Sequence, residues 1–287
     1  MLSRRALAKV NLGLHVLRRR PDGFHDLDTV FLPIGWSDTL AAEPAAELSL
    51  TTTDPDLPTD DSNLIVRAAY ALRQWAGVAH GARLHLDKQV PYGAGLGGGS
   101  SDAAAALRLL ADLWRLDVPR STLAELALGL GSDVPFFLDG VPAHATGRGE
   151  RLVPLADDAG APYRCPFWLV VAVPPVHVST AQAFAGVVPD DRQRPDLAAA
   201  VVSNSLARWR SEIVNDFQAP VEAAHPQIRA VREALESAGA GLAVLSGSGS
   251  ATVGVFEDEA PARRAAQALA GCQVWIEPPS EHSAAST

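Results

Sequence analysis

The feature that most constrains this chain is a glycine-rich segment, Pro91–Asp102, which leads directly into the helix-forming run Ala103–Leu116. The first eleven residues of this segment include five glycines and two serines. Glycine lets the main chain approach a ligand closely and adopt positive φ angles. Main-chain N–H groups at the start of a helix bind anions, and the helix dipole favours negative charge there. The segment therefore predicts a phosphate-binding loop and a nucleotide site.

Two better-known glycine loops fit this segment poorly. Gly93, Gly95 and Gly98 satisfy the G-x-G-x-x-G dinucleotide pattern, but that pattern alone is weak. The preceding residues 83–91 read as a half-polar strand that ends at a proline, not as an apolar parallel strand. A Walker loop needs a lysine after its glycines, and none is present. A plain glycine-rich turn with a serine helix cap stays an alternative, although ordinary connections need only one or two glycines.

Composition excludes several classes of protein. The chain has 287 residues, enough for a sizeable core and for two domains, and its net charge is −9. We therefore expect neither nucleic acid nor an acidic membrane as a partner. Its two cysteines, Cys165 and Cys272, indicate neither a disulfide framework nor a thiolate metal site. No apolar run is long enough to span a bilayer, and charged residues interrupt the N-terminus, so we expect a cytoplasmic protein.

Lysine is scarce in this chain. Of 24 basic residues only Lys9 and Lys88 are lysines, and the others are arginines. Such a chain is expected to use arginine wherever a generic positive charge suffices, so the two lysines are candidates for sites that need a compact ammonium group. Lys88 lies three residues before the glycine-rich segment. The alternative is that each lysine is a surface residue without a role.

Hydrophobic periodicity and turn residues predict a mixture of strands and helices. The expected strands are 7–17, 28–34, 47–53, 83–90, 167–173, 242–245, 251–256 and 272–276. The expected helices are 63–77, the segment from the glycine loop to about 116, 121–130, most of 196–217, 226–238 and 260–270. We expect an α+β fold of two domains.

A domain boundary is expected where prolines flank a polar stretch near residues 154–166. The predicted domains are residues 1–155, which would bind the nucleotide, and residues 163–277. Residues 278–287 are expected to form a disordered tail.

Asp133 is the candidate acid–base residue. It precedes the apolar run Val134–Leu138. Burying a carboxylate there without a partner would cost roughly several kcal/mol of folding free energy. Lys9, in an apolar strand, could supply the partner. A structural salt bridge is one interpretation. Beside a phosphate-binding loop, the pair instead has the composition of a general base and a charge-stabilising cation.

In their order and spacing these segments resemble the GHMP small-molecule kinases, over nearly the whole chain. The resemblance rests on the Lys9 strand, Pro21–His25, Asp61–Ile65, Pro91–Asp102, Gly131–Pro135, Asn215–Phe217 and the Gly-Ser-Gly turn 247–249. Within that family it is strongest for kinases whose acceptor is a cytidylylated alcohol. It implies an N-terminal ATP-binding domain and a ferredoxin-like C-terminal domain.

The resemblance also implies roles for residues. Asp133 would be the general base on the acceptor hydroxyl, and Lys9 would lower the pKa of that hydroxyl or stabilise developing charge. ATP would be the phosphoryl donor, with Mg²⁺ neutralising its phosphates, and no protein ligand of a metal is predicted. The residues expected to bind the nucleotide are Asn63, Lys88, Pro91, Gly93, Gly95, Leu96, Gly97, Gly98, Gly99, Ser100, Ser101, Gly247, Ser248 and Gly249. Of these, Asn63 and Lys88 would lie on the adenine side, and the turn 247–249 would support the phosphate loop from the second domain. Asp102 would favour the start of the helix or lie near Mg²⁺.

The residues expected to bind the acceptor are Asn11, Phe24, His25, Asp133, Thr180 and Phe184. By resemblance, Phe24 and Phe184 would sandwich a cytosine ring while His25 hydrogen-bonds its edge, and such stacking contributes about 1–3 kcal/mol per base. Phe24 departs from the tyrosine that is frequent at this position, so a hydroxyl contact is lost. Both phenylalanines could alternatively be core aromatics.

Two other functions stay open from the sequence. A mevalonate-, homoserine- or sugar-type kinase would share Lys9, Asp133 and the glycine loop, but its acceptor offers no base to stack on Phe24 and Phe184. A degenerate relative that only binds a nucleotide or a protein would have no need for a base at Asp133. The sequence gives no oligomeric state.

Overall fold

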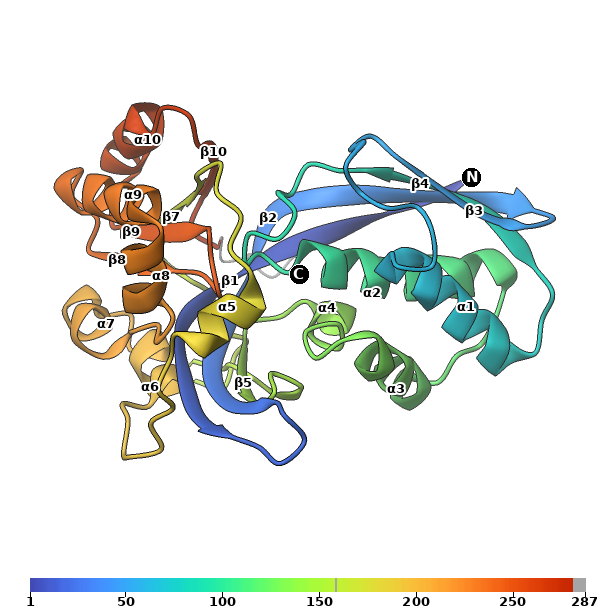
Figure 1. Ribbon diagram of the computed structural model, residues 1–287, viewed down its shortest axis with the longest axis horizontal. Coiled ribbons are helices and arrows are strands. Elements are labelled where there is room, and N and C mark those ends of the chain that lie inside the picture. Colours follow the sequence, from blue (N-terminus) through green and yellow to red (C-terminus); the bar gives the residue numbers. More distant parts are fainter. Residues whose placement is uncertain (158, 281–287) are drawn as a thin grey trace. The chain divides into compact units, whose positions relative to one another are not determined.

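The computed structural model describes residues 1–157 and 159–280 of the chain (Figure 1). The chain forms two compact units. The first consists of Met1–Lys9, Ile34–Tyr92 and Gly97–Gly140. The second consists of Val10–Pro33, Gly93–Leu96 and the chain from Val141 onward.

This division differs from the predicted single boundary between residues 155 and 163. Strand β1 spans Leu2–Arg19 and β2 spans His25–Ala45, so both are longer than predicted, and each contributes residues to both units. Most of the tail predicted to be disordered, residues 281–287, lies outside the described residues. Just before it, the Ser280 N–H donates to the carbonyl oxygen of Cys165 at 2.9 Å.

Long strands dominate the N-terminal sheet. Besides β1 and β2 it contains Leu48–Thr52 (β3), Gly81–Asp87 (β4), Ala143–Gly147 (β5) and Arg151–Pro154 (β6). The strand order is β3-β4-β2-β5-β6, and β1 pairs with β2. Strand β2 pairs antiparallel with β5 through Leu27–Phe31 and with β4 through Thr39–Ala45. Strands β3 and β4 are parallel. Strands β5 and β6 were not predicted.

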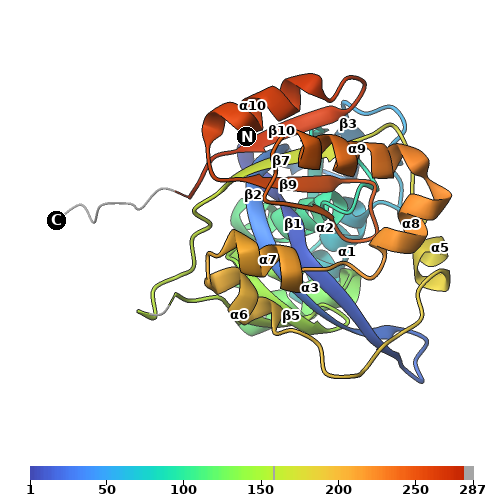
Figure 2. The ribbon, with the colours of Figure 1, turned by 90° about the vertical axis from the view of Figure 1, so that its left-hand side faces the viewer.

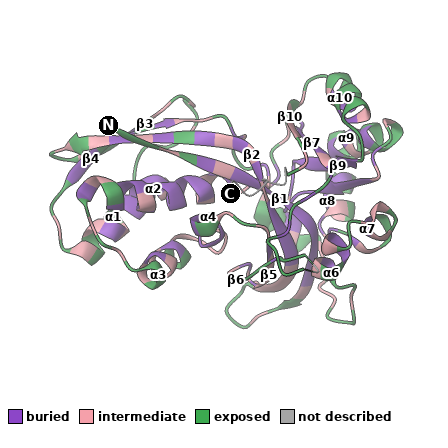
Figure 3. Cartoon of the chain, turned by 180° about the vertical axis from the view of Figure 1, so that it is seen from behind, coloured by how far each residue is buried: buried purple, intermediate pink, exposed green. Residues whose placement is uncertain are grey.

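Four helices complete the first unit: Leu64–Ala76 (α1), Gly98–Trp114 (α2), Arg120–Leu130 (α3) and Phe136–Asp139 (α4). Helix α1 begins after Asn63, whose side chain caps it, and ends at Gly77 with a positive φ. Helix α2 is buried along most of its length because its small alanines and its leucines face neighbours on several sides (Figure 3). Together α1, α2 and β4 form the core of this unit.

The second unit contains an antiparallel sheet in the order β10-β7-β9-β8, formed by Trp168–Val173 (β7), Leu242–Leu245 (β8), Thr252–Phe256 (β9) and Gln273–Glu277 (β10). Helices Pro226–Ser237 (α9) and Glu259–Ala268 (α10) cover one face of it (Figure 2). This domain has the ferredoxin-like topology that was expected. Along the chain, one strand is followed by helices, two strands, one helix and a last strand.

Four shorter helices belong to the same unit: Thr180–Ala185 (α5), Leu197–Val202 (α6), Leu206–Glu212 (α7) and Gln218–Ala224 (α8). The sequence predicted one largely helical segment over 196–217. The structure breaks it after α6, where Asn204 has a φ of 51°, and again after α7 at Ile213. Helices α5 and α8 were not predicted, whereas the two-domain α+β class is confirmed. Among the described residues, no helix combines the length and apolarity that a membrane crossing requires.

Candidate active site

The glycine-rich segment contributes to both units, and its C-terminal part starts α2 in the first unit. Gly97 is the N-cap of α2 and has a φ of 69°, a conformation that glycine adopts without a Cβ penalty. The Ser101 N–H donates to the Gly97 carbonyl oxygen at 2.9 Å and thereby closes the first turn. The N–H groups of Gly98, Gly99 and Ser100 precede that first helical bond and have no partner within α2. This is the geometry of a helix N-terminus that binds an anion.

Gly97 also lies against the candidate catalytic lysine. A Cβ at Gly97 would lie 2.6 Å from Cζ of Phe137 and 3.2 Å from Cε of Lys9. Any larger residue would therefore displace one of these side chains. The loop and Lys9 are in direct contact inside the first unit.

Lys9 and Asp133 meet as the sequence suggested. The Lys9 Nζ lies 3.6 Å from Oδ2 of Asp133. The Lys9 side chain is only 4% exposed, whereas that of Asp133 is 32% exposed. Burial lowers the pKa of Lys9, and the nearby Asp133 carboxylate opposes that shift. The pair thus has one buried cation and one carboxylate that reaches the surface.

The side chain of Lys88 is buried, so the interpretation of this lysine as a surface residue is wrong. Its ammonium group donates to carboxylates of Asp38 and Asp102, and its side chain is 4% exposed. Asp102, predicted to favour the helix start or to lie near Mg²⁺, pairs with this lysine on the second turn of α2.

Asn63, predicted to lie beside the adenine, forms hydrogen bonds to the protein backbone with both polar atoms of its side chain. Its Oδ1 accepts from the Ile65 N–H at 2.8 Å, and its Nδ2 donates to the Pro58 carbonyl oxygen at 2.7 Å. These bonds fix the start of α1. A contact with the nucleotide stays a prediction.

In the second unit, the first part of the glycine segment lies against the second glycine turn. The Ser246 Oγ donates to the Gly95 carbonyl oxygen at 2.9 Å, and the Ala251 N–H donates to that of Ala94 at 3.0 Å. A Cβ at Gly247 would lie 3.3 Å from Cα of Gly95. Turn 247–249 therefore supports the loop at Gly95.

Two residues predicted to bind the acceptor, Asn11 and Thr180, connect to the same turn. The Asn11 N–H donates to Oγ of Ser246 at 3.1 Å. The Thr180 hydroxyl shares a hydrogen bond of 3.1 Å with that of Ser248. Asn11 lies two residues after Lys9 along β1, so the two side chains share one face of that strand.

The three rings predicted for the acceptor do not form an open sandwich. The His25 and Phe184 rings stack on each other, with centroids 4.6 Å apart and planes 15° apart. The Arg148 guanidinium covers a face of Phe24 at 4.5 Å from the ring centroid. Phe24 is 50% exposed, so the interpretation as a core aromatic is wrong for it. Phe184 is partly buried and meets Phe217 edge to face.

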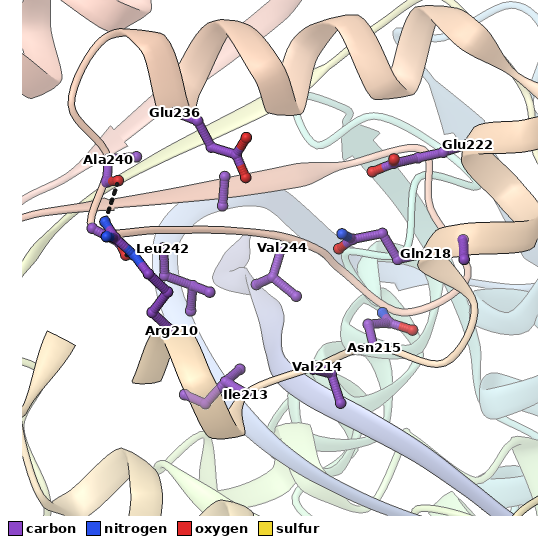
Figure 4. Close-up of a pocket in the computed structure, with 13 residues that line it drawn as sticks. Arg210, Ile213, Val214, Asn215, Gln218, Glu222, Glu236, Ala240, Leu242 and Val244 are labelled. Atoms are coloured by element: carbon purple, nitrogen blue, oxygen red, sulfur yellow. Dashed lines mark hydrogen bonds between the residues drawn. The ribbon is translucent and has the colours of Figure 1, made fainter. Parts of the chain in front are cut away.

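A cavity of about 670 Å³ also lies in the second unit (Figure 4), and one of its lining residues, Asn215, donates to the Gly247 carbonyl oxygen at 2.8 Å. Arg210 reaches across its rim to the Ala240 carbonyl oxygen. Glu222 points into it, but arginines already hold this carboxylate: Arg232 at 2.7 Å and Arg229 at 3.8 Å. The cavity contains none of the residues predicted to act on a nucleotide or acceptor, and we assign it no part in the site.

Sequence reasoning missed Asp38 and Arg148. Asp38 is a fully buried carboxylate in the apolar part of β2, so the rule that singled out Asp133 would have found it too. Arg148, in the turn between β5 and β6, carries no such signal because one more arginine is unremarkable in this chain.

Within residues 1–157 and 159–280, no group of three or more His, Cys, Asp or Glu side chains could hold a metal ion. Mg²⁺ in nucleotide sites is commonly bound through substrate phosphates and one or two carboxylates. Such binding needs no preformed cage of protein ligands, and it is compatible with a loop that is predicted to bind phosphate.

Comparison with known proteins decides the family. The model of the GHMP kinases N terminal domain matches residues 63–141, and that of the GHMP kinases C terminal domain matches residues 197–273. A protein of Salinibacter ruber, named 4-diphosphocytidyl-2-C-methyl-D-erythritol kinase, is 54% identical over 93% of this chain and 94% of its own length. The chain belongs to the GHMP kinase family. It is therefore a small-molecule kinase, and the family implies the use of ATP.

Other GHMP kinases extend the comparison. A protein of Prosthecochloris aestuarii with the same name is 44% identical over 93% of both chains. The crystal structure of a 4-(cytidine 5'-diphospho)-2C-methyl-D-erythritol kinase superposes with a TM-score of 0.82 at 38% identity, covering 98% of this chain and 100% of the other. A mevalonate kinase structure superposes with a TM-score of 0.74 at 11% identity, over 98% of this chain and 100% of the other, which shows the shared fold alone.

Proposed function

We propose that this kinase transfers the γ-phosphoryl group of ATP to the 2-hydroxyl of 4-diphosphocytidyl-2-C-methyl-D-erythritol. The products would be the 2-phosphate and ADP, in the non-mevalonate route to isoprenoid precursors. The observation that carries the proposal is the ion pair of Lys9 and Asp133 beside Gly97, where the glycine-rich segment enters α2. The identity of 54% to a relative of this name supports the acceptor.

The chemistry assigned to the pair follows from its asymmetry. The partly exposed carboxylate of Asp133 can take the proton of the acceptor hydroxyl as the hydroxyl oxygen bonds to phosphorus. The buried ammonium of Lys9 stabilises negative charge that develops on that oxygen. Because Lys9 also contacts Gly97, it ties the position of this charge to the phosphate loop.

The nucleotide would lie on the glycine-rich segment, with phosphates facing the main-chain N–H groups of Gly98, Gly99 and Ser100. The Ser100 and Ser101 hydroxyls and the remaining residues predicted for the nucleotide would complete this site. Mg²⁺, held chiefly by the phosphates, would neutralise their charge. No residue is assigned as its ligand.

The acceptor would be recognised by Asn11, Phe24, His25, Thr180 and Phe184 in the second unit. Half of the Phe24 surface is exposed and offers an aromatic face to a cytosine ring. Burial, with a smaller contribution from Arg19, lowers the pKa of His25, so at neutral pH its ring can accept as well as donate a hydrogen bond. Binding between Phe24 and Phe184 would require His25 to leave the Phe184 ring.

Release of ADP with a panel of acceptors tests this function. We expect turnover with the cytidylylated alcohol and none with mevalonate, homoserine or galactose. Turnover of one of those three, without turnover of the cytidylylated alcohol, would reject the acceptor while keeping the kinase. A cytoplasmic location and an absence of nucleic-acid partners stay predictions.

A further inference from the structure

The second lysine of the chain belongs to a buried cluster that the proposed reaction does not use. We call Asp38, Lys88 and Asp102 the buried triad. Asp38 lies on β2, Lys88 directly follows β4, and Asp102 lies on the second turn of α2. Their side chains are 0%, 4% and 5% exposed. The Lys88 ammonium donates to Oδ2 of Asp38 and, at 3.1 Å, to Oδ2 of Asp102.

The triad also holds the main chain that leads into the phosphate loop. Oδ1 of Asp38 accepts from the N–H groups of Gln89 at 2.6 Å and Val90 at 2.8 Å. The Lys88 N–H donates to Oγ1 of Thr53 at 2.9 Å. Asp38 thereby fixes the last two residues before Pro91, where the loop starts.

The other end of the loop rests on the same group of atoms. A Cβ at Gly98 would lie 3.0 Å from Nζ of Lys88 and 3.3 Å from Cγ1 of Val90. Gly98 is the first residue of α2, and Asp102 lies one turn further along it. An ammonium group at a helix N-terminus is unfavourable for the helix dipole unless a negative charge offsets it, and in the triad the carboxylate of Asp38 does so.

We propose that Lys88 is a positioning residue: bound by Asp38 and Asp102, it fixes the start of α2 and with it the phosphate-binding N–H groups, and it does not touch the adenine. The inference rests on the proposed use of a nucleotide. It replaces the expectation from the sequence that Lys88 lies against the base. A lysine that reached the base would have to break ion pairs in a region from which water is excluded, at a high cost.

The charge of the triad agrees with this role. Burial, with the nearby Asp38 charge, raises the pKa of Asp102 to about 7, although Lys88 opposes the shift. The Oδ1 of Asp102 is buried without a hydrogen-bond partner. With Asp102 protonated the triad is neutral, and it then adds no negative charge beneath the phosphates.

Binding of ADP and of adenosine separates the two roles. Asp38→Asn and Lys88→Met should each weaken ADP binding about tenfold while adenosine binding stays within twofold. Their effects should not add in the double variant, because both act through one cluster. The exposed Arg83→Met on β4 is the control and should change neither affinity.

Lys88→Met leaves two buried carboxylates unpaired and can fail to fold. The neutral variant Lys88→Met/Asp38→Asn/Asp102→Asn avoids this and should show the same selective loss for ADP. Adenosine binding weakened as much as ADP binding would overturn the proposal, and so would ADP binding unchanged in all folded variants. If the wild type binds ADP but does not phosphorylate the cytidylylated alcohol, the proposed acceptor fails and the positioning role is still judged by these affinities.

Discussion

The two lysines of this chain lie in one unit, both beside the glycine-rich loop, and their surroundings differ. Lys9 pairs with Asp133, whose side chain reaches solvent, so the pair has an open side. Lys88 lies between two carboxylates that are themselves buried. In the proposed mechanism, the ammonium group that acts on the substrate is the one whose partner is accessible. For the sealed ammonium group we propose instead that it organises the backbone around it.

The largest effect is expected at the open pair. Asp133→Asn removes the base and should lower turnover at least about 100-fold while ATP binding stays nearly intact. Steady-state rates and a binding titration with ATP check this. The matched control is Asp139→Asn, six residues further on and 56% exposed, which should retain the wild-type rate. Comparable rates for Asp133→Asn and the wild type would remove Asp133 from its role.

The second prediction keeps the positive charge at position 9 and changes the shape of the group that carries it. Lys9→Arg should lower turnover by about 10- to 100-fold, because a planar guanidinium does not fit where Cε already lies 3.2 Å from the Cβ position of Gly97. Full activity of this variant would show that a compact ammonium group is not required there.

A third test compares Gly97 in the loop with a glycine outside the proposed site. Gly97→Ala should lower activity about tenfold, since its φ is positive and the new methyl group would meet Phe137 and Lys9. Gly129→Ala in α3 is the control, because a Cβ there would meet nothing within 4 Å and its φ is not in the left-handed region. Equal activity of the two variants would contradict the close approach at Gly97.

The smallest expected effect concerns the buried triad and pH. The folded state holds the Asp102 proton up to about pH 7, whereas an unfolded chain releases it near 3.8. Between these values the folded state binds more protons, so this group's contribution to stability falls as pH rises. Asp102→Asn should therefore gain about 1–3 kcal/mol in unfolding free energy relative to wild type between pH 4 and pH 7.

Urea unfolding at several pH values measures that difference. Asp112→Asn, an exposed position on the same helix, is the control and should show a flat difference. A flat difference for Asp102→Asn as well would mean that its carboxyl group is not held in the protonated form.

Much of the catalytic pair could be predicted from the sequence, because a carboxylate before an apolar run requires a partner and lysines are rare. The same rule applied to Asp38 would have revealed the triad. What the sequence could not give is which lysine is sealed, since that depends on β2 bringing Asp38 against Lys88, 50 residues away. The stacking of His25 on Phe184 likewise depends on a contact between distant segments.

The bounds of helices and strands could likewise be predicted only in part. Core helices such as α1 and α9 were predicted to within about two residues because caps and periodicity agree there. The true lengths of β1 and β2 were not predicted, because prolines and polar residues within a long strand look like ends when its partners are unknown.

Turnover of two variants at saturating concentrations of both substrates tests the contrast between the lysines most directly. The variants are Lys9→Met and the neutral triad variant Lys88→Met/Asp38→Asn/Asp102→Asn. We predict a loss of at least about 100-fold in kcat for the first and a kcat within a few-fold of wild type for the second. Equal losses in kcat for both, in proteins shown to be folded, would contradict this prediction.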